Sequence, residues 1–496
     1  MKTPYLFSGL SSPTSTSSRR RPGSRSLGWG ESLFENHVFH QPRDLDPGLR
    51  RGDEPEKQLN PINRYKTPWV LILFFSCFLL LRFHAFAENK MEQDATKMVS
   101  LQDVLKIAQK QNPAIKAAQK RWEAEMESIS PSRSFPDPVL TFVTYKEELQ
   151  TRAGPLEKKY GISQKFPFPG KRKIKGKVAK EKARMAEEAY KSKSLKVFSQ
   201  VTNAYYELFY IDQSIRVNQQ LADQIRHFAR VAERKYATGS QTQSSVFRAQ
   251  VELAKILNDL ITLKQKRISA LARLNSFLNR PTREPLAPEK PTHLTFDDKA
   301  EDLIKVAKKY RPEILAANAL LGKSEAATSL AVRQYFPDLT VGYEISKIGS
   351  GNTNTTFDGK DAEAFRFQVN VPIWFNQMNS QYREAKAMRA SSEALLMDWT
   401  NRTMFEVEDL TVKMETATRL IKLFKDTVLP QAEQALKSSQ SGYEADRVRF
   451  LDLLDSIRTL LQFELEYYRY EANFGQAKAE LERVMGIPLS EAKKLN

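Results

Sequence analysis

The sequence contains almost none of the side chains that build disulfides, thiolate metal sites or histidine-based catalytic centres. Its 496 residues include one cysteine, Cys77, and five histidines, which are scattered at positions 37, 40, 84, 227 and 293. A single thiol forms no internal disulfide, and such dispersed imidazoles do not assemble a metal cluster. There is no P-loop or H-E-x-x-H motif, and nothing sets a nucleophile beside a histidine. The sequence therefore predicts neither an enzyme nor a protein with a bound cofactor or metal ion.

Glycine and proline, which often mark linkers, are also sparse over most of the chain. The sequence has 19 glycines and 24 prolines, and no linker-like stretch interrupts residues 100–486. Residues 1–66 differ, because they are rich in Ser, Pro and Arg and lack apolar periodicity. Such a composition is typical of segments that form no packed core. We therefore expect residues 1–66 to be a disordered leader or a mis-called upstream extension.

The sequence has only one long hydrophobic run, and residues 67–87 around it have the features of a secretory signal peptide. A basic flank, Arg64–Lys66, precedes an apolar run from Trp69 to Leu81, and Ala85–Ala87 supplies an A-x-A ending. Thirteen apolar-dominated residues are short of the roughly 20 that a membrane-spanning helix needs, so a signal peptide is favoured over a membrane anchor. We expect cleavage after Ala87, which would remove Cys77. Lipidation of Cys77 is the less favoured alternative.

Acidic residues are fewer than basic ones, and the formal net charge is +18. Loss of the 12 basic and 7 acidic residues in 1–87 would leave 65 basic and 52 acidic side chains. A positive excess can indicate nucleic-acid binding. An exported chain rarely meets nucleic acid, however, so we expect no nucleic-acid partner.

The most informative positive feature is a duplication. Phe-Pro-Asp triplets at 135–137 and 336–338 lie 201 residues apart, and each leads into a segment that alternates apolar and polar residues. This period is far too long for a solenoid repeat. We therefore expect two copies of one large unit, over residues 100–285 and 299–490.

Each copy is expected to open with a helix, at 101–131 and 299–334, in which apolar residues recur three and four apart. Proline in the Phe-Pro-Asp triplet then ends the helix. Polar loops at 147–158 and 348–361 separate the alternating segments of each pair. The predicted strands are 139–145, 160–166, 339–345 and 365–371.

The alternation gives each strand one apolar, aromatic face and one charged or amide-bearing face. It suits an ordinary antiparallel sheet on a soluble core, and it equally suits barrel strands with lipid outside and water inside. Four strands are too few to close a barrel, and an open sheet edge cannot lie in lipid. If these strands span a membrane, several chains must share one barrel.

A very long helix is expected after each strand pair. Residues 171–236 contain no proline and one glycine, and 66 residues at about 1.5 Å each give a rod on the order of 100 Å. In the second copy, apolar residues lie alternately three and four positions apart, which is the spacing of a coiled-coil seam: Val407, Leu410, Met414, Ala417, Ile421, Phe424 and Val428. Pro430 should kink this second rod. Returning helices at 243–279 and 448–485 follow, and in each copy the opening and returning helices end to end roughly match one rod.

These motifs resemble those of the TolC-like outer-membrane factors over about residues 100–490. The resemblance rests on Gly161-Ile162-Ser163-Gln164 leading to Phe168-Pro169-Gly170-Lys171-Arg172, on Leu429-Pro430-Gln431-Ala432-Glu433, and on Gly442-Tyr443 followed by Phe450-Leu451-Asp452-Leu453-Leu454-Asp455. It implies a mainly α fold with a small β part. Long coiled-coil helices would form a periplasmic tunnel, and four strands per chain would contribute to a trimeric twelve-stranded outer-membrane barrel.

The same resemblance implies partners and a location. The chain would be a homotrimer in the outer membrane, in contact with its lipid. It would work with a periplasmic adaptor (a membrane fusion protein) and with an inner-membrane pump of the RND or ABC type. The expected function is that of a passive exit duct for small molecules or metal ions. The outer-membrane component of type I protein secretion is an alternative, and a soluble periplasmic coiled-coil scaffold is an alternative of a different class.

Family members close the tunnel tip with a Tyr/Arg latch, and the motifs place its counterparts here. Tyr443 matches the latch tyrosine. The aligned position of the latch arginine is Val448, which lies between Arg447 and Arg449. In the first copy, Ser245 stands where a latch aspartate would be. The resemblance therefore implies a gate at this tip that departs from the family pattern.

The family's acidic rings are matched by Asp452 and Asp455. These residues are three apart, so they share a helix face, and three copies would form a ring of six carboxylates that selects cations. The alternative is a solvated acidic helix start that the helix dipole stabilises. A basic run over residues 171–184 is likewise expected to be a solvated face, with contact to anionic lipid headgroups as the alternative.

Overall fold

The computed structural model of the chain describes residues 98–240, 242–292 and 294–495. These described residues all belong to one compact unit. The expected leader (1–66), the expected signal peptide (67–87) and Cys77 lie outside the described residues.

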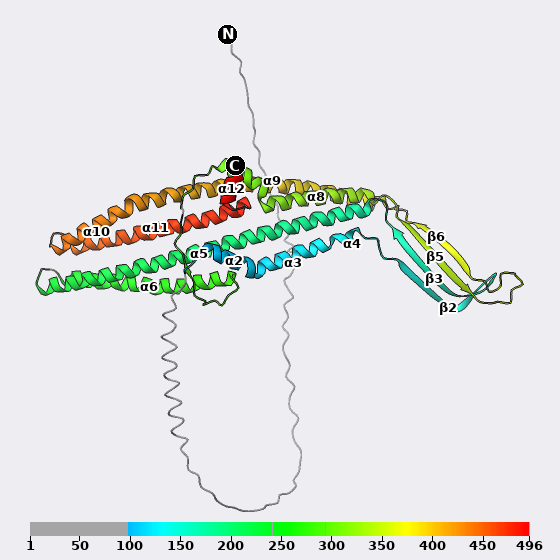
Figure 1. The fold of residues 1–496 in the computed structure, drawn as a ribbon, viewed down its shortest axis with the longest axis horizontal. Coiled ribbons are helices and arrows are strands. Elements are labelled where there is room, and N and C mark those ends of the chain that lie inside the picture. The colour runs from blue at the N-terminus through cyan, green and yellow to red at the C-terminus, as the bar shows by residue number, and fades with distance from the viewer. Residues whose placement is uncertain (1–97, 241, 293, 496) are drawn as a thin grey trace, which may run out of the picture. The chain divides into compact units, whose positions relative to one another are not determined.

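The described elements follow the same order twice (Figure 1). The short strand β1 (Met98–Val99) precedes the first copy and pairs in parallel with β4 (Ala287–Pro288). The first copy contains helices α2 (Leu101–Gln111), α3 (Pro113–Glu127) and α4 (Ile129–Arg133), strands β2 (Val139–Thr151) and β3 (Gly154–Phe166), and helices α5 (Lys171–Ala237) and α6 (Gln243–Phe277). The second contains helices α7 (Ala300–Tyr310) and α8 (Pro312–Arg333), strands β5 (Leu339–Ile348) and β6 (Ala362–Val369), helix α9 (Phe375–Leu423), the π-helical turn η1 (Phe424–Val428), and helices α10 (Leu429–Glu444) and α11 (Phe450–Met485). A final helix, α12 (Leu489–Leu495), follows.

The expectation of one continuous opening helix in each copy is wrong, because a proline divides both. Pro113 and Pro312 each stand at the first position of a new helix, where the missing N–H costs nothing. Asn112 is extended and caps α3 by accepting hydrogen bonds from the amides of Ala114 (2.9 Å) and Ile115 (3.2 Å). In the second copy Arg311 occupies the equivalent place, and its side chain makes no cap.

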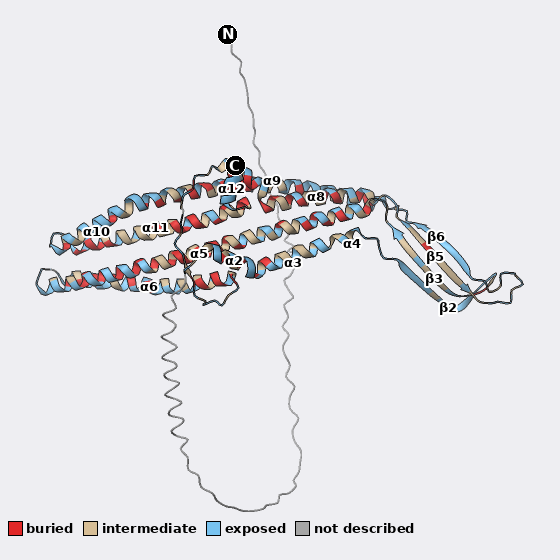
Figure 2. Cartoon of the chain, viewed as in Figure 1, coloured by how far each residue is buried: buried red, intermediate tan, exposed pale blue. Residues whose placement is uncertain are grey.

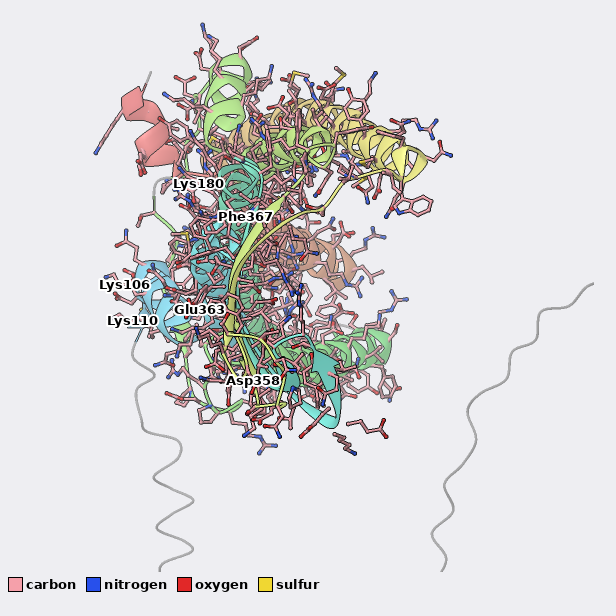
Figure 3. The ribbon with its side chains drawn as sticks, turned by 90° about the vertical axis from the view of Figure 1, so that its right-hand side faces the viewer. Lys106, Lys110, Lys180, Asp358, Glu363 and Phe367 are labelled. Atoms are coloured by element: carbon pink, nitrogen blue, oxygen red, sulfur yellow. The ribbon has the colours of Figure 1, made fainter. Side chains whose placement is uncertain are left out.

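The expected loop at 147–158 is also wrong. Strand β2 continues to Thr151 and β3 begins at Gly154, so the first pair is a long hairpin with a tight turn. The register shifts between Thr144 and Leu149, which accommodates the charged residues that suggested a loop. The second expected loop is present between β5 and β6. There Asp358, labelled in Figure 3, accepts hydrogen bonds from the Ser350 hydroxyl (2.7 Å) and the Gly351 amide (3.1 Å).

Both rods form as expected. α5 has 67 residues. The second rod continues through Pro430 rather than stopping there, because Pro430 lies in the first turn of α10 and the π-helical turn η1 precedes it. A π-turn shifts the hydrogen-bond pattern locally, which is one way to accommodate a proline inside a long helix.

Two short helical segments placed end to end do match each rod (Figure 1). α6 lies beside the half of α5 remote from the sheet, and α2 to α4 lie beside the half that leads to the sheet. α11 and α7 with α8 are arranged in the same way around the second rod. Buried residues run along these helices, whereas the sheet is mostly exposed or half-buried (Figure 2). Among the described residues, no helix has both the length and the apolarity that crossing a membrane requires.

Candidate functional site

The four long strands form one antiparallel sheet in the order β2-β3-β5-β6. The register places Leu140 opposite Ile162, Ile162 opposite Tyr343, and Tyr343 opposite Phe365. Directly opposed residues share a face, so the apolar residues of all four strands lie together. We call this surface the apolar sheet face: Leu140, Phe142, Tyr160, Ile162, Phe166, Leu339, Val341, Tyr343, Ile345, Phe365, Phe367 and Val369.

The apolar sheet face is open to solvent in the single chain. Leu140 is 77% exposed, Phe365 74% and Phe367 70% (Phe367 is labelled in Figure 3). A contiguous apolar surface of this size on a soluble monomer is unusual and indicates a lipid or protein neighbour.

The opposite face of the sheet is polar and is crossed by an ion-pair network. Glu344 on β5 pairs with Lys159 on β3 at 2.8 Å and with Arg366 on β6 at 2.6 Å. The two faces thus differ as the inside and outside of a water-filled barrel do. Within the described residues, β2 and β6 each have one strand neighbour, so both outer edges carry free backbone groups.

Where the sheet meets the helices, Asp338 holds several segments together. Its carboxylate accepts hydrogen bonds from the Lys171 ammonium (2.8 Å) and the Phe168 amide (2.9 Å) and pairs with Lys165 at 3.2 Å. Burial acts to raise the pKa of Asp338, but these bonds outweigh burial and lower that pKa to about 2. Phe168 also stacks on Phe336, with ring centres 4.5 Å apart.

The helical hairpins α5–α6 and α10–α11 end side by side, at the end of the helices remote from the sheet (Figure 1). Tyr443, the expected latch tyrosine, is fully buried there and packs against Phe228 and Phe450, at ring-centre distances of 6.4 and 5.7 Å. Burial and the nearby Asp446 raise its pKa. In the described part of the chain, the Tyr443 hydroxyl has no hydrogen-bond partner. Gly442 is required beside it, since a Cβ there would lie 2.5 Å from a methyl carbon of Val448.

A lysine that the sequence did not single out connects the two tips. Lys235, near the end of α5, donates hydrogen bonds to the carbonyl oxygens of Tyr443 (2.6 Å) and Glu444 (3.1 Å) and to Asp446 (2.6 Å). Its ammonium also lies 4.9 Å from the centre of the Tyr443 ring. The only signal in the sequence is its place immediately before the expected turn at 236–239.

A second ion pair joins the hairpins further from the tip. Arg458 on α11 donates to Glu252 on α6 at 2.8 Å and makes a second, shorter contact with the same carboxylate. The hydrogen bonds from Arg458 lower the pKa of Glu252. Sequence reasoning missed this pair, because the two residues lie 206 positions apart.

The expected arginines and aspartates lie on the surface around this tip. Arg449 forms a two-pronged ion pair with Asp452, both contacts at 3.1 Å, and these hydrogen bonds lower the pKa of Asp452. Asp455 is exposed on the same face of α11, and Arg447 is exposed in the turn. Ser245 lies at the start of α6, where its amide donates to the Thr242 carbonyl at 3.0 Å. The structure thus places Tyr443 in contact with Lys235, which joins the two hairpin tips, whereas Arg449 is ion-paired with Asp452.

Comparison with known proteins agrees with this geometry. The family described as "Outer membrane efflux protein" matches residues 104–280 and 303–487. The cobalt-zinc-cadmium resistance protein CzcC of Cupriavidus metallidurans is 23% identical over 397 residues, which cover 79% of this chain and 91% of CzcC. The pyoverdine export outer membrane protein OpmQ of Pseudomonas aeruginosa is 24% identical over 327 residues, which cover 64% of this chain and 68% of OpmQ.

Solved structures share the fold. The outer membrane protein VceC of Vibrio cholerae superposes with a TM-score of 0.65 at 19% identity, over 78% of this chain and 96% of VceC. CusC superposes with a TM-score of 0.64 at 14% identity, over 79% of this chain and 93% of CusC. The family that the duplicated motifs indicated is therefore confirmed by both the sequence match and the fold: the chain belongs to the outer membrane efflux protein family.

Proposed function

We propose that this chain is the outer-membrane exit duct of a tripartite efflux system and conducts small molecules or metal ions passively to the exterior. The observation that carries the proposal is the two-faced sheet, which has an exposed apolar face, an ion-paired polar face and two open edges. Lipid would cover the first face, and water in the duct would hydrate the second. The chain itself would carry out no catalytic step.

The open edges of β2 and β6 support a homotrimer. Backbone groups left free at an edge are costly in lipid, so β6 of one copy must pair with β2 of the next until the wall closes. Three copies would give a barrel of twelve strands, of a size that leaves a passage.

Unpartnered helix faces support the same assembly. On α6, Phe247 and Val251 are four residues apart and Ile261 and Ile268 seven apart, and all four are more than half exposed. On α9, Phe405 and Val412 are also exposed and seven apart. Heptad spacing on exposed apolar faces is typical of helices that pack against a neighbouring coil, so the helices of three copies would form a closed periplasmic tunnel.

The domain organisation follows from this assembly. Residues 100–285 and 299–490 would be the two outer-membrane-factor repeats, each supplying one strand pair and one helical hairpin. Residues 67–87 would be the signal peptide that directs export, and residues 1–66 a leader or mis-called extension. The hairpin tips, remote from the sheet, would face the periplasmic adaptor and the inner-membrane pump, which supplies the energy.

The named relatives support the proposed substrate range. One is a cobalt-zinc-cadmium resistance protein and another exports pyoverdine, so metal ions or small molecules are favoured over secreted proteins. Deleting the gene and measuring growth in cobalt, zinc and cadmium salts tests this range. Unchanged metal and drug tolerance together with loss of a secreted protein would instead indicate type I protein secretion.

At the tip, Asp452 and Asp455 would form the ring that favours cations, and Tyr443, Arg447 and Arg449 would form the surrounding gate. Replacing both aspartates with Asn should reduce cation preference in single-channel recordings, because six carboxylates are removed from the narrowest passage. Unchanged selectivity would show that these carboxylates lie outside the conduction path.

Cell fractionation tests the function itself. The duct predicts a heat-modifiable trimer in the outer membrane that needs detergent for extraction. A monomer in the soluble periplasmic fraction would support the coiled-coil scaffold and end the duct proposal.

A further inference from the structure

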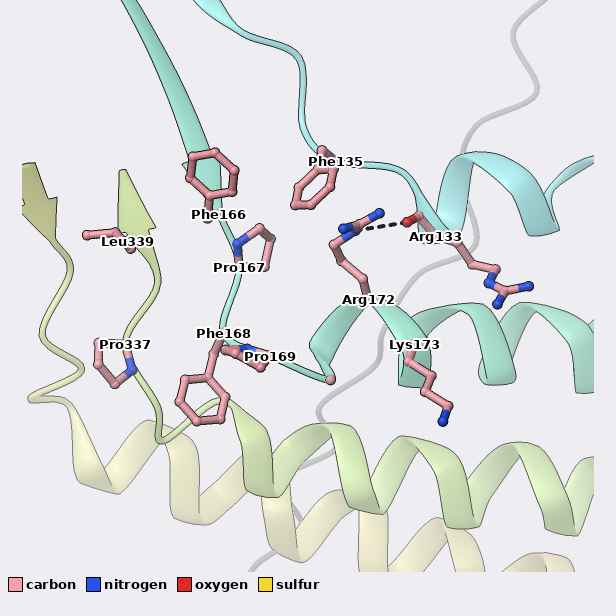
Figure 4. Close-up of a pocket in the computed structure, with 11 residues that line it drawn as sticks. Arg133, Phe135, Phe166, Pro167, Phe168, Pro169, Arg172, Lys173, Pro337 and Leu339 are labelled. Carbon is pink, nitrogen blue, oxygen red and sulfur yellow. Dashed lines mark hydrogen bonds between the residues drawn. The ribbon is translucent and has the colours of Figure 1, made fainter. Parts of the chain in front are cut away.

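A cavity of about 680 Å³ opens where the sheet meets the helices (Figure 4). Its basic lining residues are Arg133, Arg172 and Lys173, and its apolar ones include Phe135, Phe166 and Leu339. The turn between β3 and α5, residues 167–170, forms the rest of one wall. Among the residues that the structure describes, no aspartate or glutamate lines the cavity.

Two contacts hold the Arg172 side chain in place beside the cavity. Its guanidinium carbon lies 3.3 Å from the centre of the Phe135 ring, and its Nε donates a hydrogen bond to the Arg133 carbonyl at 2.9 Å (Figure 4). These contacts leave the two terminal nitrogens available as a fork of donors, the geometry that phosphate oxygens accept.

The cavity also concentrates positive charge that the protein does not neutralise. Within the described ranges, no carboxylate pairs with Arg133, Arg172 or Lys173, whereas the neighbouring Lys165 and Lys171 both pair with Asp338. The basic run at the sheet–helix junction is thus divided into neutralised cations that brace the fold and free cations that line a cavity. Free cations grouped around an opening attract an anionic ligand.

The lining of this cavity reaches the apolar sheet face, because Phe166 and Leu339 belong to both. Four residues along β3 from Phe166, a distance of about 13 Å, Ile162 lines a separate hollow of about 390 Å³ that shares no lining residue with the first. This second hollow runs over β2, β3 and β5, and its large side chains all belong to the apolar sheet face: Leu140, Phe142, Tyr160, Ile162, Tyr343 and Ile345. A ligand that satisfies both parts has an anionic head and a long apolar tail.

We infer that the cavity binds the phosphate headgroup of an anionic glycerophospholipid, with an acyl chain lying along the apolar sheet face. The inference rests on the proposed position of the sheet in the outer membrane. Because the cavity lies at the edge of the sheet nearest the helices, the lipid comes from the leaflet that faces the periplasm. Arg172 contacts the phosphate, Arg133 and Lys173 add charge, and Phe166 adjoins the start of the acyl chain.

Native mass spectrometry of the purified trimer tests this site. The trimer is incubated with mixed micelles of phosphatidylglycerol and phosphatidylcholine that carry the same acyl chains, and the bound lipids are counted. Wild type should retain phosphatidylglycerol preferentially. Arg172→Gln should reduce this preference about fivefold, the effect of one basic residue close to an anionic lipid surface. The matched control is Lys175→Gln, which removes an exposed cation from the same helix outside the cavity and should change nothing.

A second variant and two further measurements distinguish loss of the lipid site from failure to assemble. If Arg172→Gln fails to assemble, Lys173→Gln removes an exposed side chain that the fold does not need and should show a similar loss. The lipid site would be overturned if wild type showed no preference for phosphatidylglycerol. It would also be overturned if the cavity variants and Lys175→Gln showed the same preference for that lipid. Displacement of the lipid by inorganic phosphate alone would identify free phosphate as the ligand and overturn the lipid assignment. Single-channel conductance in phosphatidylcholine bilayers should be unchanged by Arg172→Gln, so failure of the lipid site is separable from failure of the duct.

Discussion

Replacing Lys235 with Met tests how the hairpin tips are held together. Met keeps an apolar stem against the Tyr443 ring but removes donors at 2.6 and 3.1 Å from two carbonyls and at 2.6 Å from Asp446. The Lys235 side chain is 15% exposed and that of Asp446 56%, so solvent screens their ion pair and its contribution should stay below about 1 kcal/mol. The carbonyl bonds from a largely buried ammonium should contribute about 2 to 3 kcal/mol.

A loss of that size shifts an equilibrium between joined and separated tips on the order of 30- to 150-fold toward separation. Single-channel recording in planar bilayers should therefore show that Lys235→Met raises the ratio of time in a high-conductance state to time in the closed state by about that factor. The control Arg234→Met removes an exposed cation from the adjacent position and should resemble wild type. Asp446→Asn should have a small effect, since Asn also tolerates the φ of 60° found there. A Lys235→Met channel that opens and closes as wild type does would refute the role of Lys235 in holding the hairpin tips together.

Three other substitutions test the described contacts. Tyr443→Phe removes a buried hydroxyl that has no hydrogen-bond partner in the described chain, so the unfolding temperature should be unchanged or higher and channel closure should be retained. A lower unfolding temperature or an open channel would contradict this. Arg311→Met removes a side chain that is only 1% exposed and that pairs with Glu406 at 2.8 Å. Because Glu406 is 32% exposed and keeps Arg483 at 3.9 Å, the loss should be about 1 to 3 kcal/mol, while the exposed Lys308→Met should be neutral; equal unfolding temperatures would contradict this. The pKa of Asp338 is lowered to about 2 in the folded chain, so its carboxylate stabilises the fold by about 2 kcal/mol above pH 4, and this contribution is lost as pH falls toward 2. Asp338→Asn should flatten this part of an acid-unfolding curve. An unchanged curve would show that the Asp338 carboxylate does not contribute to the acid dependence of stability.

The elements with one simple period were predictable from sequence. The alternation in residues 339–345 and 365–371 requires strands, and the proline-free run 171–236 requires a long helix, so both fold as expected. The breaks at Pro113 and Pro312 were missed because the surrounding apolar spacing continues across them. Their position is decided by chemistry at the helix start, as the Asn112 cap shows.

The site was less predictable, because its decisive contacts join residues distant in sequence. Tyr443 was expected at the tip and lies there, but nothing local showed that its ring is buried between the hairpins. Lys235 reads as an ordinary basic residue near a helix end, and its role depends on a turn 208 positions away. The cavity at Arg172 likewise depends on Phe135, which only the folded chain brings beneath the guanidinium.

The most direct test of the account is the number of chains in the detergent-solubilised particle extracted from the outer membrane, measured by native mass spectrometry. In the described part of the chain, the four-stranded sheet has two open edges, which require copies to share one wall, and the family fold leads us to expect three copies. A particle of three chains is the predicted result. A monomer, or a stable assembly with any other number of chains, would contradict the account.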